Sequence, residues 1–489
     1  MFERTGVCST DRFPVNVLLS LHWHAHHNYP PFMSLVNSAK RRPPGPDAPV
    51  LLGVDPGTLE VLQEAQRRFG NIVSMRRPDG REALFINDPA EIRRILVRKH
   101  SRYRKGPGFE RVKMLLGNGL IVSDGELWRR SRTMIQPAFS RSNMHQLIDV
   151  IVKCCAERER TWSAVARAGK WLNMTQESSD FALELILQAM FGKDYEQVVL
   201  PGEANPFAFL SEESARDLRV VLKVRELRDV LLRIVERRRA SAGSDSFDFL
   251  SVYLSARDKS GTGFSDVELL DELVTLIVAG YETSAGTLNW AWHLLAGDPG
   301  WSERLAAEAQ VHLADRETIA AEDVAAMQYT QALLEETLRL FPPVWLFTRR
   351  SACDDVMGDG YALAAGTDIY LSPFILHRTE EFWPEPERFD PARFDRNIPP
   401  EATGAGGACR QGESAYFPFS LGPRRCLGEY FAFLEMKIHL GLLTRKFVMT
   451  RVDAAPPSLD LGINLRSKTD VFLRPQFRTS EPQHRNEIV

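Results

Sequence analysis

The ten residues from Phe419 to Gly428 (FSLGPRRCLG) constrain this chain more than any other stretch, because they place a cysteine in a short loop bounded by glycines. Gly422 and Gly428 let the backbone turn tightly and approach a flat ligand closely. A helical pattern begins near Leu427, and the N-terminal amides of such a helix would point at the sulfur of Cys426. We therefore interpret Cys426 as a metal ligand, with a buried structural cysteine as the alternative.

The pattern Phe-x-x-Gly-x-Arg-x-Cys-x-Gly resembles the haem-binding loop of the cytochrome P450 family, and every fixed position of that motif is filled here. The resemblance implies a haem-thiolate protein with the cytochrome P450 fold, which is mainly α with a minor β region. It also implies that Cys426 is the axial ligand of the iron in haem b. Phe419, Arg424 and Gly428 would then bind the cofactor, with Arg424 meeting an anionic edge of the haem.

The 489 residues carry a net charge of −3 and are 44% hydrophobic, which is typical of a soluble globular protein with a sizeable core. A slightly acidic chain argues against nucleic acid as a partner. The N-terminal part holds no apolar run of about 18 residues, so we expect no transmembrane anchor. The six cysteines are scattered without paired spacing, which favours a reducing compartment, and we expect a cytoplasmic monomer.

We expect three parts along the chain. Residues 1–42 form a leader that is partly disordered, 43–475 form the catalytic domain, and 476–489 form a polar C-terminal tail. The proline-rich segment Arg41–Pro46 reads as a rigid linker and resembles the hinge that precedes the catalytic domain in many family members. Four histidines lie between residues 22 and 27, but no carboxylate or cysteine accompanies them, so a surface-draped leader is favoured over a metal site.

Trp128 and Arg132 lie four residues apart, on one face of an expected helix. An indole N–H and a guanidinium that point the same way can bind one carboxylate, and a surface arginine beside a core tryptophan is the alternative. The pair resembles the family's Trp-x-x-x-Arg motif, which implies that both residues bind a haem propionate. Arg350 stands where the family often places another propionate partner, and its neighbour Arg349 is the alternative.

A capping box at Ser265–Glu268 predicts a helix from 265 to 295, the longest that we expect. Gly280 leaves room for the cofactor beside this helix, and the Thr283 hydroxyl can bond back to a carbonyl. A capped core helix with a kink is the alternative. The segment AGYETS resembles the family's oxygen-activation motif, which implies that Thr283 donates a proton to bound oxygen and that Glu282 supplies protons.

Glu336 and Arg339 lie three residues apart on an expected helix, where an exposed pair would contribute only a few tenths of a kcal/mol. They resemble the family's Glu-x-x-Arg pair, which implies a buried brace that is completed by an arginine from a downstream loop. Arg388 and Arg393 are the two candidates, and the wider pattern Pro-x-x-Phe-x-Pro-x-Arg-Phe selects Arg393. Substitution in this brace should cause loss of haem.

The walls of a substrate pocket follow from the resemblance by position. The glycine-punctuated loop 106–120 is one wall, and we expect it to be irregular. The segment 191–237, which roofs the pocket in the family, is short here, with one long amphipathic helix at 216–239. A β-like hairpin is expected at 459–473. The further pocket residues are Ala279, Val344, Phe347 and Ile463.

Together these motifs imply a haem-thiolate monooxygenase that inserts one oxygen atom from O2 into a lipophilic small molecule, by hydroxylation or epoxidation. Electrons from NAD(P)H would arrive through a ferredoxin and its reductase or a flavodoxin-type donor, since no flavin-type domain is recognisable. A positive patch of Arg129, Arg130, Arg424 and Arg425 would steer such an acidic donor. The alternatives are non-hydroxylating or peroxide-driven chemistry (desaturation, coupling) and a non-catalytic haem sensor, against which the proton-relay residues speak.

Overall fold

The computed structural model describes residues 41–53, 55–198, 207, 218–240, 247–314, 318–396, 415–453 and 455–478. The chain divides into two units, 1–41 and 42–489, and the second unit is described below. The leader with its histidines, most of 199–217 in the roof segment and the tail from 479 lie outside the described residues.

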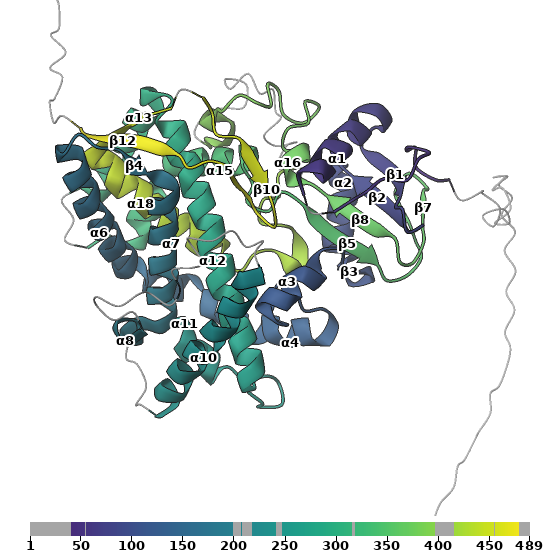
Figure 1. The fold of residues 1–489 in the computed structure, drawn as a ribbon, viewed down its shortest axis with the longest axis horizontal. Helices are drawn as coiled ribbons and strands as arrows, with labels where there is room; N and C mark the ends of the chain where they lie inside the picture. Colours follow the sequence, from purple (N-terminus) through teal and green to yellow (C-terminus); the bar gives the residue numbers. More distant parts are fainter. Residues whose placement is uncertain are drawn as a thin grey trace, which may run out of the picture. The chain divides into compact units, whose positions relative to one another are not determined.

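Helices dominate the second unit and pack beside a smaller β region (Figure 1). A hydrophobic core joins α6, α7, α12 and α18. No helix in the described part of the chain is long and apolar enough to cross a lipid bilayer. The helices are α1 (Pro56–Phe69), α2 (Pro89–Arg93), α3 (Phe109–Leu116), α4 (Gly125–Ile135), α5 (Arg141–His145), α6 (Ile148–Arg167), α7 (Met174–Phe191), α8 (Tyr195–Val198), α10 (Leu218–Ala240), α11 (Phe249–Ser255), α12 (Asp266–Leu295), α13 (Pro299–Leu313), α14 (Ala321–Ala326), α15 (Gln328–Leu340), α16 (Pro373–Leu376) and α18 (Glu429–Lys446).

The strands form one five-stranded sheet and three smaller ones. The large sheet has the order β1 (Ile72–Arg76), β2 (Glu82–Ile86), β8 (Asp368–Leu371), β5 (Phe347–Ser351) and β3 (Tyr103–Lys105), and its β2 and β8 run parallel. A three-stranded sheet has the order β4 (Leu172–Asn173), β12 (Phe472–Phe477) and β9 (Phe447–Arg451). The two-stranded sheets are β10 (Leu459–Leu461) with β11 (Leu465–Ser467), and β6 (Asp355–Val356) with β7 (Ala362–Leu363).

Helix α12 begins where the capping box predicts. The Ser265 hydroxyl accepts the amide of Glu268 at 3.3 Å, and the Glu268 carboxylate accepts the amide of Ser265 at 2.9 Å. Two orphan amides at the helix start are thereby satisfied. The predicted range 265–295 is confirmed.

Two local expectations are wrong. The loop 106–120 is not irregular throughout, because it contains α3, which Gly108 and Gly117 bound at its two ends with positive φ angles of 95° and 77°. The hairpin predicted at 459–473 ends earlier, with β11. The chain then enters β12, which pairs with β9 and β4 and includes Gln476 and Phe477, the first residues of the predicted tail.

Candidate functional site

The cysteine loop closes on itself before α18 begins. The amide of Cys426 donates to the carbonyl of Phe419 at 3.0 Å. Gly422 has a φ of 69°, and a Cβ there would lie 2.2 Å from the carbonyl oxygen of Leu96, in the helical turn Arg94–Arg98. The loop therefore packs directly on the backbone of that turn. Gly428 has an ordinary φ of −81°, and a Cβ there would make contacts no closer than 3.9 Å. Gly422 therefore makes the tight turn and the close approach, whereas Gly428 leaves open space beside the sulfur.

Cys426 lies two residues before Gly428, which caps the start of α18. Its side chain is exposed, although the protein surrounds the sulfur closely enough for burial to raise the pKa of the thiol. The amides of Gly428 and Glu429 donate to the sulfur, and the Arg132 guanidinium is near; both effects lower the pKa and oppose burial. The amides at the start of α18 thus stabilise a thiolate, but burial still favours the protonated thiol. A further cation at the sulfur would favour the thiolate.

Three cations gather beside this loop. Lys105 of β3 and Arg349 of β5 are directly paired residues on neighbouring antiparallel strands, and Arg424 of the cysteine loop lies near both. Burial lowers the pKa of all three, to about 10 for Arg349, and the charge of Arg424 lowers the pKa of Lys105 and Arg349 further. Within the described residues, Asp124 is the carboxylate that faces them. Like charges opposite one another in a sheet destabilise it, so the cluster is short of negative charge.

Arg350 lies outside this cluster. Its Nε donates to the Asp368 carboxylate at 2.6 Å, and Asp368 also accepts from Arg77 at 3.0 Å. Successive residues of a strand point to opposite faces, so Arg349 and Arg350 cannot serve the same site. The family resemblance favours Arg350, whereas the structure places its neighbour Arg349 in the cluster.

Trp128 and Arg132 both reach the cysteine loop from α4. The guanidinium of Arg424 lies over the indole of Trp128, 4.3 Å from the ring centroid, and Arg424 also pairs with Asp124. Arg132 donates to the carbonyl of Arg425 at 2.8 Å. The two residues predicted from the motif therefore converge on the segment that carries Cys426.

The middle of α12 is more accessible than the rest of the helix. Most of this helix is buried, but Val278, Ala279, Gly280, Glu282 and Thr283 are half-buried. Thr283 donates to the carbonyl of Ala279 at 2.9 Å, as the sequence predicts. At Gly280 the close neighbour is not a ligand: a Cβ there would lie 2.8 Å from the Ile186 side chain of α7. The glycine therefore permits close packing of α7 on α12.

Glu282 points at the β10–β11 hairpin. Arg466 lies 3.8 Å from its carboxylate and Asn464 donates a hydrogen bond to it. Burial raises the pKa of Glu282, and these two partners oppose that shift. The carboxyl is thus held next to this accessible stretch of α12 by Arg466 and Asn464, whose role has no local signal in the sequence.

The segment 343–345, which includes the predicted pocket residue Val344, lies against the same hairpin. The Trp345 indole donates to the carbonyl of Gly462 at 3.0 Å, and the Leu465 amide donates to the carbonyl of Pro343 at 2.8 Å. Val344 and Phe347 flank these contacts and are half-buried, while Ile463 at the hairpin tip is 46% exposed. The segment from 106 also reaches this region, because Thr348 donates to the carbonyl of Pro107 at 2.8 Å.

Glu336, Arg339 and Arg393 come together in the interior. Arg339 donates to the Glu336 carboxylate with two nitrogens, at 2.7 and 2.8 Å, and Arg393 lies 3.4 Å from the same carboxylate. Arg388 is exposed and pairs with Glu385 instead. Glu336 and Arg339 are fully buried, so a single substitution would leave an uncompensated charge in the core.

A sequence model of the cytochrome P450 family matches residues 50–472. The chain belongs to the cytochrome P450 family. It is 31% identical over 378 residues to cyclooctatin synthase from Streptomyces melanosporofaciens, a match that covers 74% of this chain and 79% of that protein. Cyclooctat-9-en-7-ol 5-monooxygenase from the same organism is 28% identical over 443 residues, with 84% and 92% covered.

The fold agrees with this membership. A crystal structure of a cytochrome P450 (CYP102L1) matches with a TM-score of 0.78 at 23% identity, over 90% of this chain and 100% of that one. The expected class, mainly α with a minor β region, is confirmed. The protein is accordingly a P450 monooxygenase, and the family implies a haem-thiolate cofactor, a redox partner and a small-molecule substrate.

The residues present fit such a cofactor. A metal ion deprotonates the thiol that binds it, which would overcome the burial that raises the pKa of Cys426. The two carboxylates of a haem would supply the negative charge that Lys105, Arg349 and Arg424 lack. Haem would therefore supply both the cation that Cys426 needs and the negative charge that the three basic residues need.

His377 lies beside the buried brace of Glu336, Arg339 and Arg393, and its role was not expected from the sequence. Its Nε2 accepts the amide of Phe417 at 3.1 Å, so its Nδ1 carries the proton and donates to the carbonyl of Arg339 at 3.3 Å. Burial and the Arg339 charge lower the pKa of His377, so the ring is neutral. The histidine thereby joins the brace to Phe417, two residues before the cysteine loop. Nothing in the local sequence around His377 signals this role.

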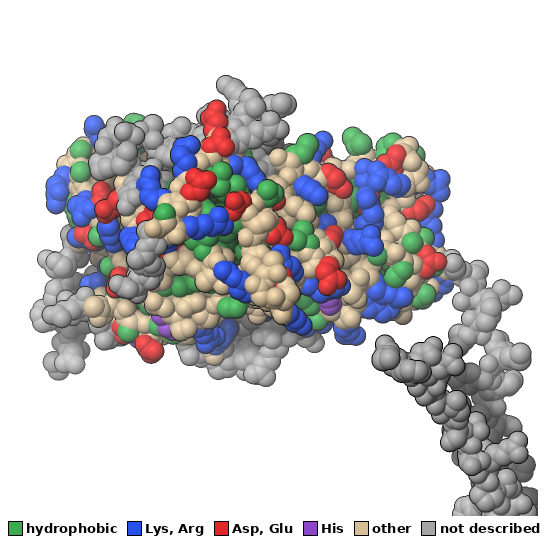
Figure 2. All heavy atoms as spheres, turned by 90° about the horizontal axis from the view of Figure 1, so that it is seen from below, with side chains coloured by type: hydrophobic (Ala, Val, Ile, Leu, Met, Phe, Trp, Pro, Cys, Tyr) green, Lys and Arg blue, Asp and Glu red, His purple; other side chains and the backbone are tan. Residues whose placement is uncertain are grey.

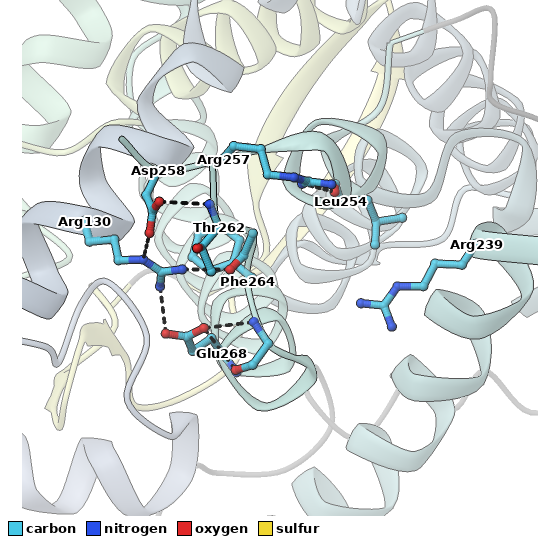
Figure 3. A pocket seen from close by; sticks show the side chains of 10 residues that line it. Arg130, Arg239, Leu254, Arg257, Asp258, Thr262, Phe264 and Glu268 are labelled. Carbon is cyan, nitrogen blue, oxygen red and sulfur yellow. Dashed lines mark hydrogen bonds and ion pairs between the residues drawn. The ribbon is translucent and has the colours of Figure 1, made fainter. Parts of the chain in front are cut away.

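The predicted positive patch of this P450 is smaller than expected. Arg130 turns away from the cysteine loop into a pocket of about 640 Å³ beside the start of α12 (Figure 3), where it pairs with Asp258 and Glu268 at 2.7 Å each. Arg424 is largely buried against Asp124. On the face drawn in Figure 2, basic and acidic side chains are interspersed. Of the four predicted arginines, Arg129 and Arg425 remain largely exposed, with 63% and 56% of their side chains accessible.

Proposed function

We propose that Cys426 binds the iron of haem b as a thiolate and that the protein inserts one oxygen atom from O2 into a lipophilic small molecule. The observation that carries this proposal is the Cys426 sulfur, which accepts hydrogen bonds from the amides of Gly428 and Glu429 within a loop that fills the family motif. Once bound, haem would supply the binding and reductive activation of O2. The roles of the surrounding residues follow from their contacts.

Lys105, Arg349 and Arg424 hold the haem carboxylates, together with Trp128 and Arg132 of α4. The cluster carries excess positive charge, and charge-assisted hydrogen bonds to carboxylates are the strong ones. Arg349 takes the place that the family resemblance gives to Arg350. The roles of Phe419 and Gly428 as neighbours of the haem rest on the family motif.

Glu282 and Thr283 deliver protons. The Thr283 hydroxyl donates to the carbonyl of Ala279, which leaves its oxygen lone pairs free to accept a hydrogen bond from a water molecule of the relay. Burial favours the protonated form of Glu282, and Arg466 and Asn464 hold its carboxyl at the accessible stretch of α12. A proton can then pass from the acid towards the hydroxyl.

The coupling of electron use to product formation tests this relay. Thr283→Ala and Glu282→Gln should keep NAD(P)H consumption but divert most of it to peroxide, because bound oxygen is no longer protonated correctly. The matched control is Thr287→Ala: Thr287 lies one turn further on α12 and donates to a backbone carbonyl at 2.9 Å in the same way. Coupling that stays intact in both relay variants, or that fails equally in the control, contradicts the relay.

The substrate is proposed to be an apolar, ring-containing molecule. The relative named for a 5-monooxygenase reaction acts on an unsaturated cyclic alcohol, and the walls proposed here (Ala279, Val344, Phe347, Ile463) are apolar. A library of cyclic hydrocarbons and alcohols is screened for the low-spin to high-spin shift of the haem, and each hit is turned over under ¹⁸O2. One ¹⁸O atom in the product supports the proposal, whereas a dehydrogenated or coupled product without ¹⁸O favours the non-hydroxylating alternative.

Electrons are proposed to come from NAD(P)H through a ferredoxin and its reductase or a flavodoxin-type protein. Arg129 supplies most of the exposed positive charge for an acidic donor, because the exposed Arg425 is paired with Glu429 at 2.5 Å. A cytoplasmic setting is consistent with the free thiols of Cys154, Cys155 and Cys353.

A further inference from the structure

Three of the four carboxylates in the first two turns of α12 lie on one face of the helix, and each holds a different neighbour. Glu268, Asp271 and Glu272 are spaced three and four residues apart, so they lie on one face of the helix. Glu268 pairs with Arg130 of α4 at 2.7 Å, and Glu272 accepts the amide of Leu120 at 2.9 Å. The three carboxylates thus anchor the surroundings of the proposed pocket to one helix.

Asp271 is the member that touches two elements at once. One carboxylate oxygen accepts the amide of Asn118 at 2.7 Å, in the loop that follows α3. The other accepts from the Arg228 guanidinium of α10 at 2.6 Å. With 11% of the Asp271 side chain and 24% of the Arg228 side chain accessible, this ion pair is screened less than a surface pair.

The loop from 117 to 120 is fitted to α12 without room for side chains. Gly117 has a φ of 77°, and a Cβ there would lie 2.0 Å from the Asp271 carboxylate. A Cβ at Gly119 would lie 2.3 Å from the hydroxyl of Thr275. The backbone of this loop therefore lies directly on the helix, and the position of the Asp271 carboxylate determines where the loop can sit.

Helix α10 and the loop that follows α3 both lie against the first turns of α12. Both α3 and α10 pack against α12 and against each other (Figure 1). The loop has a second anchor on α12, because the Glu272 carboxylate accepts the amide of Leu120. Loss of the Arg228 contact should therefore loosen the loop rather than detach it.

We propose that Asp271 is a positioning residue that couples the roof helix α10 to the pocket-wall loop 117–120, so that displacement of Arg228 loosens that wall and widens access for bulky substrates. This inference rests on the proposed function in one respect only, namely that the loop borders the substrate pocket. The coupling itself concerns contacts within the protein.

Hydrogen–deuterium exchange on the full chain as purified tests the coupling. Arg228→Gln removes the ion pair without touching the loop, and it should speed exchange of the amides in 116–120 several-fold. The matched control is Arg239→Gln: Arg239 also links α10 to α12, through Asp266 at 2.7 Å, but this pair is exposed. The control should leave exchange in 116–120 unchanged.

Two outcomes overturn the proposal. One is faster exchange in α10 alone after Arg228→Gln, which would make the ion pair a local contact. The other is an equal effect of the two variants on 116–120, which would reflect general loosening of α10. Should Arg228→Gln not fold, Arg228→Met and Arg239→Met, which also remove the charge, are compared by the same criteria.

A second readout concerns access. The association rates of imidazole and of 4-phenylimidazole are followed through the haem absorbance of both variants. Arg228→Gln should raise the rate of the larger probe several-fold and that of the smaller probe less, and equal changes for both probes contradict the widening of access. Because exchange in 116–120 does not depend on the haem ligand, a failure of the thiolate assignment would leave the coupling result interpretable.

Discussion

At the scale of single residues, Arg349 and Arg350 are neighbours in β5 with opposite surroundings. Arg349 is buried near Lys105 and Arg424, whereas Arg350 pairs with Asp368. A hydrogen bond to a charged group contributes about 1.5–3 kcal/mol, so Arg349→Gln should speed haem loss by roughly tenfold to a hundredfold. Transfer of haem to a scavenging apoprotein measures this rate.

Arg350→Gln is the matched control for that experiment. It removes an arginine from the same strand and leaves Asp368 with Arg77 as its partner. Haem retention in this variant should equal that of the wild type. Faster haem loss from Arg350→Gln than from Arg349→Gln would contradict the assignment of the propionate site.

Glu435 makes the stability of the protein depend on pH. It is buried in α18 with the Ser284 hydroxyl as a hydrogen-bond donor, and burial raises its pKa from 4.5 to about 8. Between these values the folded state keeps a proton that the unfolded state releases. The stabilising contribution is therefore complete below the unfolded pKa and is lost as the pH rises through the folded pKa.

Glu435→Gln should abolish this contribution to the pH dependence. The melting temperature of the wild type should fall more steeply between about pH 5 and pH 8 than that of the variant, and the variant should be the more stable protein at about pH 8. Thermal unfolding of both proteins across this range measures the difference. Parallel curves would show that Glu435 does not hold a proton in the folded state.

At the scale of elements, the cysteine loop depends on Gly422. A non-glycine residue at positive φ costs about 1–2 kcal/mol, and here the added Cβ would also overlap the Leu96 carbonyl. Gly360 has a similar φ of 79° but open space around it. Gly422→Ala should therefore destabilise the fold by more than Gly360→Ala and lower haem content, as denaturant unfolding and haem absorbance would show. Equal effects would mean that the packing on Leu96 is not required.

Elements with local signals could be predicted from the sequence. The capping box located the start of α12, and the glycine-bounded motif located the cysteine loop and the helix after it. The proline spacing pointed to Arg393 rather than Arg388, and the structure brings Arg393 to Glu336. In each case the decisive residues lie within about ten positions of one another.

Elements that depend on distant partners were not predictable. Lys105 and Arg349 are paired across two strands far apart in the sequence, and β12 takes its partners from β9 and β4 rather than from the adjacent hairpin. Helix α3 was missed because glycines at its ends resemble an irregular loop. Cross-strand pairing and tertiary packing decide these features, and neither leaves a local pattern.

At the scale of the whole molecule, docking of an electron donor depends on the charges that remain exposed. Arg129→Glu should slow electron transfer from an acidic ferredoxin several-fold and weaken its dependence on salt, because an exposed charge acts through long-range attraction. The control is Arg67→Glu, which makes the same charge change on a different helix, α1, where the side chain is 70% exposed. Stopped-flow reduction of the two variants compares them, and equal rates would contradict docking at Arg129.

The central claim is that Cys426 supplies a thiolate to haem iron, and the absorption spectrum of the reduced, carbon monoxide-bound protein tests it most directly. The wild type and the control Cys353→Ser should show the Soret band typical of thiolate ligation, and Cys426→His should lose it while still binding haem. A wild-type spectrum without that band, or a Cys426→His spectrum that keeps it, would contradict the assignment.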